Sequence, residues 1–223
     1  MQLKGLMDNR QILIPFINLK MIGKPFNAET YQYHQVVMGI ESERPEEYIH
    51  AQITTLKTAM KHPIIQNLPL DIKTSLFAFQ NIHAGLGIVN VNFHDRRKAE
   101  NYLTLEIGHK QGHSKLLINY VRPEHDQSGI TREIKRVRRA LRRLGCLAPS
   151  GMIYVRPMGA SVHYSGTIPM STEKVSWTTS KYCQSHDFDN LFIVDGATFP
   201  FLPAKNMTFT LMANAVRVAE CAF

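Results

Sequence analysis

Four short apolar runs between residues 74 and 121 constrain the fold more than any other feature of the chain. They read TSLFAFQ, LGIVNVNFH, NYLTLEIG and KLLINYV, and turn residues such as Gly108 and Gly112 separate them. Runs of this length that are rich in Val, Ile, Leu, Phe and Tyr and partly alternate are typical of strands. The earlier segment QILIPFINLKMIGKP ends at Gly and Pro, which favours an extended conformation. The sequence therefore predicts a largely antiparallel sheet.

Helical patterns occur before and after these runs. Residues 45–62 begin with proline and acids, and their apolar side chains recur at helical spacing until Pro63, which predicts a helix. Near the C-terminus, residues 191–194 are apolar and predict a short buried strand that ends at Asp195 and Gly196. A loop and a helix at about residues 207–220 follow. Strand, loop and helix in this order resemble the closing unit of an α/β nucleotide-binding fold, so the expected fold class is α+β.

Most of the formal net charge of +8 lies in the segment ITREIKRVRRALRRLGC, which holds seven Lys or Arg residues and the single acid Glu133. Its apolar residues recur every three or four positions, which predicts an amphipathic helix that ends at Gly145. The helix from Arg132 to Arg143 has two possible roles, a binding surface for phosphate or acidic partners, or a solvated face. No aromatic side chains lie between the cations, which favours the solvated face and argues against nucleic acid as a partner.

Composition and segment lengths exclude several classes of protein. The share of hydrophobic residues, 44%, and of charged residues, 20%, are those of an ordinary folded chain. No stretch reaches the roughly 18 apolar residues that span a bilayer, and the start, MQLKGLMDNR, lacks the pattern of a secretory signal. The three cysteines show no metal-ligand spacing. We expect a cytoplasmic protein with no membrane span and no metal site.

Three separated pieces of the chain resemble the C-terminal signature of the glucose-methanol-choline (GMC) oxidoreductases. They are HxxGT at residues 163–167, NLFIVDGATFP at residues 190–200, and NMTFTLMANAVRVAE at residues 206–220. Segments near the N-terminus are similar to the substrate domain of bacterial members. The resemblance implies a substrate-binding domain at residues 1–155 and, at residues 156–223, the C-terminal segment of an FAD-binding domain. It also implies FAD as the cofactor and oxidation of the CH–OH group of a small-molecule alcohol.

The glycine-rich motif that binds the dinucleotide in this family is absent from the sequence. The nearest candidate, residues 85–90 (GLGIVN), lacks the third glycine and leads into a β-rich run, which predicts a turn that enters a strand. The chain therefore resembles only the C-terminal part of a flavoprotein. The implied partner is the N-terminal FAD-binding half, in cis or in trans, and the chain alone is expected to be inactive.

The resemblance implies two catalytic residues, His163 and Asn206. His163 would be the base that removes the hydroxyl proton, and the amide of Asn206 would hydrogen-bond the substrate oxygen; an asparagine cannot exchange protons, which leaves this role to the histidine. Two structural roles stand beside these. His163 could be a hydrogen-bonded structural histidine, and Asn206 could cap the helix that follows it.

The resemblance also implies a set of cofactor-binding residues. Met207 and Thr208 lie at the start of the last helix, where free backbone N–H groups and the helix dipole stabilise an anion such as reduced flavin. Asp195 and Gly196 match the family's position beside the flavin and its ribityl chain. A turn after a strand would explain Asp-Gly equally well. The alternative to the enzyme is a non-catalytic binding module that uses the basic helix.

Overall fold

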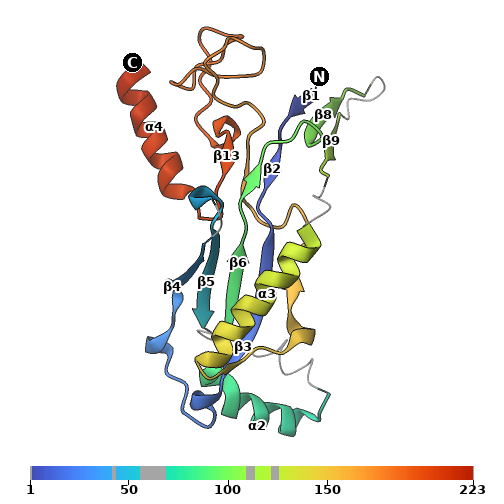
Figure 1. The fold of residues 1–223 in the computed structure, drawn as a ribbon, viewed down its shortest axis with the longest axis vertical. Coiled ribbons are helices and arrows are strands. Elements are labelled where there is room, and N and C mark those ends of the chain that lie inside the picture. The colour runs from blue at the N-terminus through green and yellow to red at the C-terminus, as the bar shows by residue number, and fades with distance from the viewer. Residues whose placement is uncertain (1, 42–43, 56–68, 109–113, 122–125, 223) are drawn as a thin grey trace.

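The computed structural model of the chain describes residues 2–41, 44–55, 69–108, 114–121 and 126–222. It is elongated, with the larger sheet at one end and the two termini together at the other (Figure 1). Helices and antiparallel strands occur together, so the expected α+β class is confirmed. No helix within the described ranges is long and apolar enough to cross a bilayer.

The larger sheet has six strands, all antiparallel, in the order β10-β3-β6-β5-β4, and β11 also pairs with β3. The strands are β3 (Gln11–Asn18), β4 (Tyr33–Ile40), β5 (Ile49–Thr55), β6 (Leu86–Asn92), β10 (Cys146–Leu147) and β11 (Tyr154–Val155). The extended conformation predicted for the segment of β3 and the strand predicted at β6 are both confirmed, and every second side chain of each strand turns to one face. Ile12, Ile14, Val89 and Val91 on that face are fully buried or nearly so.

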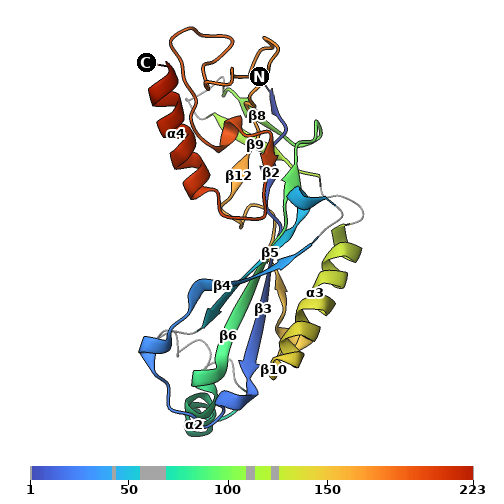
Figure 2. The same cartoon turned by 60° about the vertical axis from the view of Figure 1, so that its left-hand side comes forward.

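Helix α3 (Asp126–Arg143) lies along this face and closes the core, as both views show (Figures 1 and 2). Val137 and Leu141 of the predicted stripe are 2% exposed, whereas Leu144, just beyond the helix, is 60% exposed. The chain leaves the helix at Gly145, whose φ of +80° suits glycine. The predicted basic amphipathic helix is therefore confirmed, although its apolar stripe ends one turn early.

The helix expected at residues 45–62 is wrong for its described part. A 3₁₀ turn (Pro45–Glu47) leads into β5, which pairs with β4 on one side and β6 on the other. Ile49 and Ile53 are four residues apart, a spacing that puts two side chains on one face of a helix and also of a strand. Hydrogen bonding to β4 and β6 along both edges of the segment stabilises the strand. Residues 56–62 of the expected helix lie outside the described residues.

The strand expected from TSLFAFQ is also wrong, because this run lies in helix α2 (Ile72–Ile82). The carboxylate of Asp71 caps the helix, accepting from the backbone N–H of Lys73 at 3.0 Å and of Thr74 at 3.1 Å. Ser75 and Phe79, one turn apart, are its buried residues. The cap at Asp71 was the signal for a helix.

The turn expected at residues 85–90 is confirmed. Gly85 ends the 3₁₀ turn η4 (His83–Gly85), and Gly87 lies within β6. A β-carbon on Gly87 would lie 2.5 Å from Cζ of Phe16 on the neighbouring strand, so this glycine makes room for a core aromatic ring.

The other end of the molecule is built from three small sheets and the last helix, α4 (Thr208–Ala222). The small sheets are β1-β8-β9, β2-β12 and β7-β13, with β1 (Gln2–Lys4), β2 (Met7–Asp8), β7 (Asp95–Arg96), β8 (Tyr102–Glu106), β9 (Lys115–Asn119), β12 (Tyr164–Ser165) and β13 (Phe201–Leu202). The expected strands β8 and β9 and the expected last helix are confirmed. The pair β2-β12 joins residues from both sides of position 155, where the domain boundary is predicted.

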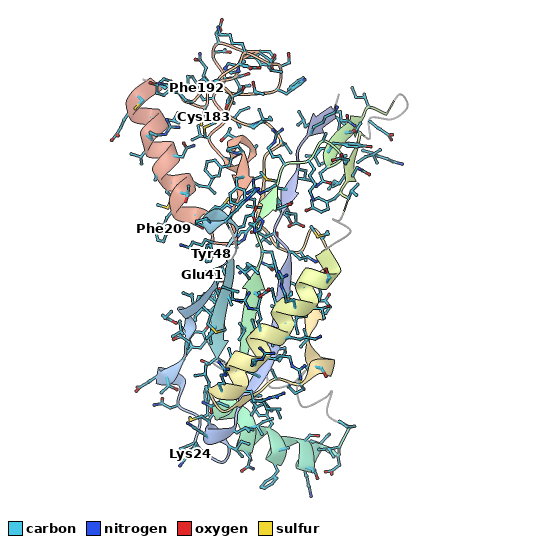
Figure 3. All side chains as sticks on the ribbon, viewed as in Figure 1. Lys24, Glu41, Tyr48, Cys183, Phe192 and Phe209 are labelled. Atoms are coloured by element: carbon cyan, nitrogen blue, oxygen red, sulfur yellow. The ribbon has the colours of Figure 1, made fainter. Side chains whose placement is uncertain are left out.

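The strand expected at residues 191–194 is wrong. In the described part of the chain this segment makes an isolated bridge between Gln184 and Phe192, and two backbone hydrogen bonds flank it, from Ile193 N to Cys183 O at 2.9 Å and from Ser185 N to Leu191 O at 2.8 Å. Figure 3 shows Cys183 and Phe192 in the loop region beside α4. A strand is held by continuous hydrogen bonds to a neighbour. The described residues supply no such neighbour for this segment.

Candidate functional site

The HxxGT segment and the Asp-Gly segment lie side by side, although about thirty residues separate them in the sequence. Gly166 N donates to Gly196 O at 3.1 Å, Ile168 N to Ala197 O at 2.9 Å, and Met170 N to Thr198 O at 2.8 Å. These three bonds join the HxxGT segment and the residues that follow it to the 3₁₀ turn η6 (Gly196–Thr198). Two of the three pieces singled out in the sequence therefore meet in one place.

The N-terminal segment is the third part of the chain that packs at this position. Strand β2 pairs with β12, so that Asp8 is opposite Tyr164 and Met7 is opposite Ser165. Arg97 reinforces the junction, because its Nε donates to Gly166 O at 2.6 Å. The segment that carries His163 is thus held between strand β2 near the N-terminus and the Asp-Gly segment near the C-terminus.

His163 is half-buried, and its ring is held by Asn9, which the sequence analysis missed. His163 Nδ1 lies 3.0 Å from Asn9 Oδ1. The other end of the same amide, Asn9 Nδ2, donates to Phe93 O at 2.7 Å and to Pro203 O at 3.1 Å. Asn9 is 2% exposed. No motif marks Asn9 in the sequence, because all of its partners are remote in the chain.

The backbone around His163 is also anchored. His163 N donates to Ser161 Oγ at 2.9 Å, and that hydroxyl in turn donates to the carboxylate of Asp8. The other oxygen of Asp8 accepts from Gly159 N at 2.5 Å. Turn 159–163 is therefore fixed to the strand that precedes Asn9.

Burial controls the electrostatics of the two titratable groups in the site. Burial lowers the pKa of His163 below its usual 6.5, and the negative charge of Asp8 opposes this effect. Burial raises the pKa of Asp8, against the lowering effect of its hydrogen bonds from Gly159 and Ser161. The net result is a His163 imidazole that is neutral at pH 7, the form that can accept a proton.

The start of α4 lies beside these segments. Helix α4 begins at Thr208, so Met207 occupies the cap position and Asn206 lies one residue earlier. Asn206 is exposed, and within the described residues its amide makes no hydrogen bond, so the cap role expected for it is wrong. The side chain of Met207 is 5% exposed and packs with Met7 and Leu202.

The structure links His163 to Asn206 indirectly. Within the described ranges no hydrogen bond joins the two side chains. Asn9 connects them, because its amide contacts His163 on one side and donates to Pro203 O, three residues before Asn206, on the other. Asn206 thus lies at the end of a loop that is tied to the same asparagine as the imidazole.

Asp195 and Gly196 border an open pocket of about 310 Å³, which Ser165 and Thr167 also line. The Asp195 carboxylate accepts from Ala197 N at 2.7 Å, so the turn expected at Asp-Gly is confirmed. A β-carbon on Gly196 would lie 2.7 Å from Tyr164 O, so only glycine fits there. Ser165 Oγ is buried and has no hydrogen-bond partner in the described structure. The pocket edge therefore offers the exposed carboxylate of Asp195, and not the buried hydroxyl of Ser165, to a polar, hydroxylated ligand.

The basic helix lies along the larger sheet, away from the end of the molecule that holds α4 (Figure 2). Arg132 and Arg136 pair with Glu133 of the same helix at 2.9 Å and 3.2 Å, and Glu133 is 1% exposed. Arg138 Nε donates to Ala148 O at 3.0 Å. Part of the cationic surface is thus neutralised or hydrogen-bonded within the chain.

Two comparisons with known proteins concern the family of the chain. A family model described as GMC oxidoreductase matches residues 97–215, more than half of the chain. An uncharacterised GMC-type oxidoreductase, y4nJ of Sinorhizobium fredii (strain NBRC 101917 / NGR234), is 32% identical over 62 residues. That match covers 28% of this chain and 12% of the relative's length, so the matched segment is a small part of the relative.

Proposed function

The chain belongs to the GMC oxidoreductase family, and on this premise we propose that it is the C-terminal part of an FAD-dependent enzyme that oxidises the CH–OH group of a small-molecule alcohol. One observation carries the proposal. The HxxGT segment is hydrogen-bonded to the Asp-Gly turn, and Asn9 ties its half-buried, neutral imidazole to the loop that precedes α4. A neutral histidine is the side chain suited to removing an alcohol proton near pH 7.

His163 is the proposed base, and Asn206 the proposed hydrogen-bond donor to the substrate oxygen. The lowered pKa of His163 keeps its ring able to accept the hydroxyl proton. The amide of Asn206 is exposed and is engaged by no other described residue, so it is free to donate to an incoming oxygen. Removal of the proton by one group and stabilisation of the oxygen by the other are the two tasks that these residues would perform.

The residues of the pocket fit FAD. The exposed carboxylate of Asp195 lies at the pocket edge, where it can accept hydrogen bonds from the hydroxyl groups of a polyhydroxylated chain, and the close packing of Gly196 against Tyr164 O holds this turn in place. The backbone N–H groups of Met207 and Thr208 open helix α4, where the positive end of the helix dipole favours an anion. When bound, the flavin supplies the acceptor for the hydride that leaves the alcohol carbon.

The proposed partner is the N-terminal FAD-binding half of the family, in cis or in trans. To test this, the chain is purified alone and together with such a half, and bound-flavin absorbance is recorded for both. We expect flavin to be retained only by the combined protein, which should also reduce an electron acceptor in the presence of an alcohol. A combined protein that folds but holds no flavin would contradict the proposal.

The pH dependence of turnover follows from the environment of His163. Because burial lowers the pKa of His163, kcat/KM is expected to be level above pH 7 and to fall as the pH drops through a midpoint below 6.5. The charge of Asp8 raises that pKa, so Asp8→Asn should move the midpoint to a still lower pH. A pH-rate profile of the flavin-loaded protein measures both values. A midpoint above 6.5 would contradict the assignment of His163 as the base.

A second candidate function is a binding module for acidic partners, and the exposed cations of α3 favour it. Lys135, Arg139, Arg142 and Arg143 are exposed on this helix. The test is retention on DNA, RNA or an acidic polymer at physiological ionic strength, with charge reversal at these four positions as the control. Retention that is lost with the charge reversal would support the module. Equal elution of both proteins would exclude it.

A further inference from the structure

We propose that Asn9 is a positioning residue that holds His163 in the Nδ1–H tautomer and thereby presents Nε2 as the proton acceptor. The inference rests on the proposed role of His163 as the base. It assigns a function to a residue at the opposite end of the chain, 154 positions from the histidine.

The first step is the orientation of the Asn9 amide. The two ends of an amide have nearly the same shape, so their assignment depends on the hydrogen-bond partners. One end faces Phe93 O at 2.7 Å and Pro203 O at 3.1 Å, and backbone carbonyls can only accept. The end that faces them must therefore be the NH₂ group, and both of its hydrogens are used. The oxygen, Oδ1, is left to face the imidazole.

The second step is the proton on the ring. Asn9 Oδ1 can only accept, and it lies 3.0 Å from His163 Nδ1, so a hydrogen bond requires the proton on Nδ1. In a neutral imidazole that carries its proton on Nδ1, the lone pair is on Nε2. The ring is neutral at pH 7 because burial outweighs the nearby charge of Asp8. Nε2 is then the atom that accepts a proton.

The third step is the rigidity of the arrangement. Asn9 is 2% exposed, so water cannot take the place of a hydrogen-bond partner that is lost. An unsatisfied polar group would then remain buried, which costs free energy. Its three partners come from the end of β6, the loop before α4 and the HxxGT segment. One amide thus fixes the ring relative to the loop that ends at Asn206. Aspartate at this position could donate to neither carbonyl and would place a negative charge beside the ring.

The direct test is the protonation state of the two ring nitrogens of His163. The full chain is labelled with ¹⁵N-histidine, and the His163 signals are assigned by comparison with His163→Gln. At pH 7 we expect a protonated Nδ1 and an unprotonated Nε2. A proton found on Nε2 would overturn the proposal. This measurement needs no variant of Asn9, so it gives an answer even if such a variant fails to fold.

Two variants then separate positioning from mere structural support. Asn9→Leu keeps the branching and the number of side-chain heavy atoms but removes all three hydrogen bonds, so we expect a mixed tautomer and a kcat about 10–100-fold lower with KM little changed. Asn9→Asp should raise the pKa of His163 and move the midpoint of the pH-rate profile upward. Asn119→Leu is the matched control, because that amide also donates to a backbone carbonyl, Glu100 O at 2.6 Å, but has no contact with His163.

The outcomes distinguish this inference from the proposed function. If Asn9→Leu leaves both the tautomer and the pH profile unchanged, Asn9 does not position the ring. If the tautomer is as expected but His163→Ala keeps full turnover, the role of His163 as the base fails while the structural role of Asn9 stands. If His163→Ala abolishes turnover but the proton lies on Nε2, the role of His163 as the base stands and the positioning role of Asn9 fails.

Discussion

Replacing His163 with alanine is expected to reduce kcat of the flavin-loaded enzyme by about 10²–10⁴-fold, the usual contribution of a positioned acid–base group. The reason is that the imidazole is half-buried, neutral and oriented by a hydrogen bond at 3.0 Å from Asn9, and the described site holds no second histidine bonded in this way. Steady-state kinetics with bound-flavin absorbance measured on the same sample provide the test. Flavin retention matters, because it separates loss of the base from loss of the cofactor.

The matched control for this substitution is His186→Ala. His186 is also half-buried, and its ring also makes one side-chain hydrogen bond, from Nδ1 to Thr178 Oγ1 at 2.8 Å. It lies in the loop between the signature pieces and has no contact with Asn9 or Asp8 among the described interactions. We expect turnover to remain near that of the parent. Full turnover of the His163→Ala protein with its flavin in place would end the proposed mechanism.

Replacing Gly166 with alanine is expected to destabilise the chain far more than the same change at Gly159. Both glycines have a positive φ, +91° and +84°, which costs an alanine about 1–2 kcal/mol. At Gly159 nothing lies within 4 Å of the added carbon. At Gly166 the carbon would lie 2.5 Å from Met7 Cε and 2.6 Å from Gly5 O. Such overpacking costs a further ~1–3 kcal/mol.

Urea unfolding of the two variants and the parent separates these two contributions. The loss of unfolding free energy at Gly159 measures the backbone conformation alone, and the excess loss at Gly166 measures the clash with the N-terminal segment. The backbone carbonyl of Gly5 cannot rotate away as the Met7 side chain can, so the excess should persist after relaxation. Equal losses for both variants would show that the N-terminal segment does not pack against the HxxGT glycine.

Local patterns in the sequence correctly predicted those helices and strands whose tertiary contacts favour the same structure as the pattern does. The alternation in LGIVNVN gave a strand because Val89 and Val91 lie on one face and are buried together. The predicted stripe of residues 134–144 gave a helix because its apolar side chains recur at the helical period, and all of them except Leu144 cover the sheet. In both cases the spacing is compatible with only one regular structure.

The wrong expectations have identifiable causes. Ile49 and Ile53 fit a helix and a strand equally, and pairing with β4 and β6 decided between them. The apolar run at residues 74–80 has high strand propensity, but the cap at Asp71 and the burial of Phe79 stabilise a helix. Residues 191–194 are apolar enough for a strand, yet the described chain provides only the isolated bridge from Gln184 and the two hydrogen bonds that flank it. Propensity is a weak guide wherever tertiary contacts oppose it.

The candidate site divides in the same way. His163, Gly166, Asp195, Gly196 and Asn206 could be named from the sequence because each lies in a short piece that resembles a family signature. Their convergence was implied by that resemblance, and the backbone hydrogen bonds from residues 166–170 to residues 196–198 show that two of the pieces are adjacent.

Asn9 could not be named in advance. A buried amide finds its partners among whichever carbonyls and ring nitrogens the packed chain brings near it, and those of Asn9 are 84, 154 and 194 residues away. Residue types and their spacing along the chain were enough to indicate the family and to single out His163. The state of that imidazole, which nitrogen holds the proton and how strongly burial lowers its pKa, depends on segments that meet only when the chain folds, because hydrogen bonding and desolvation act through distances in space.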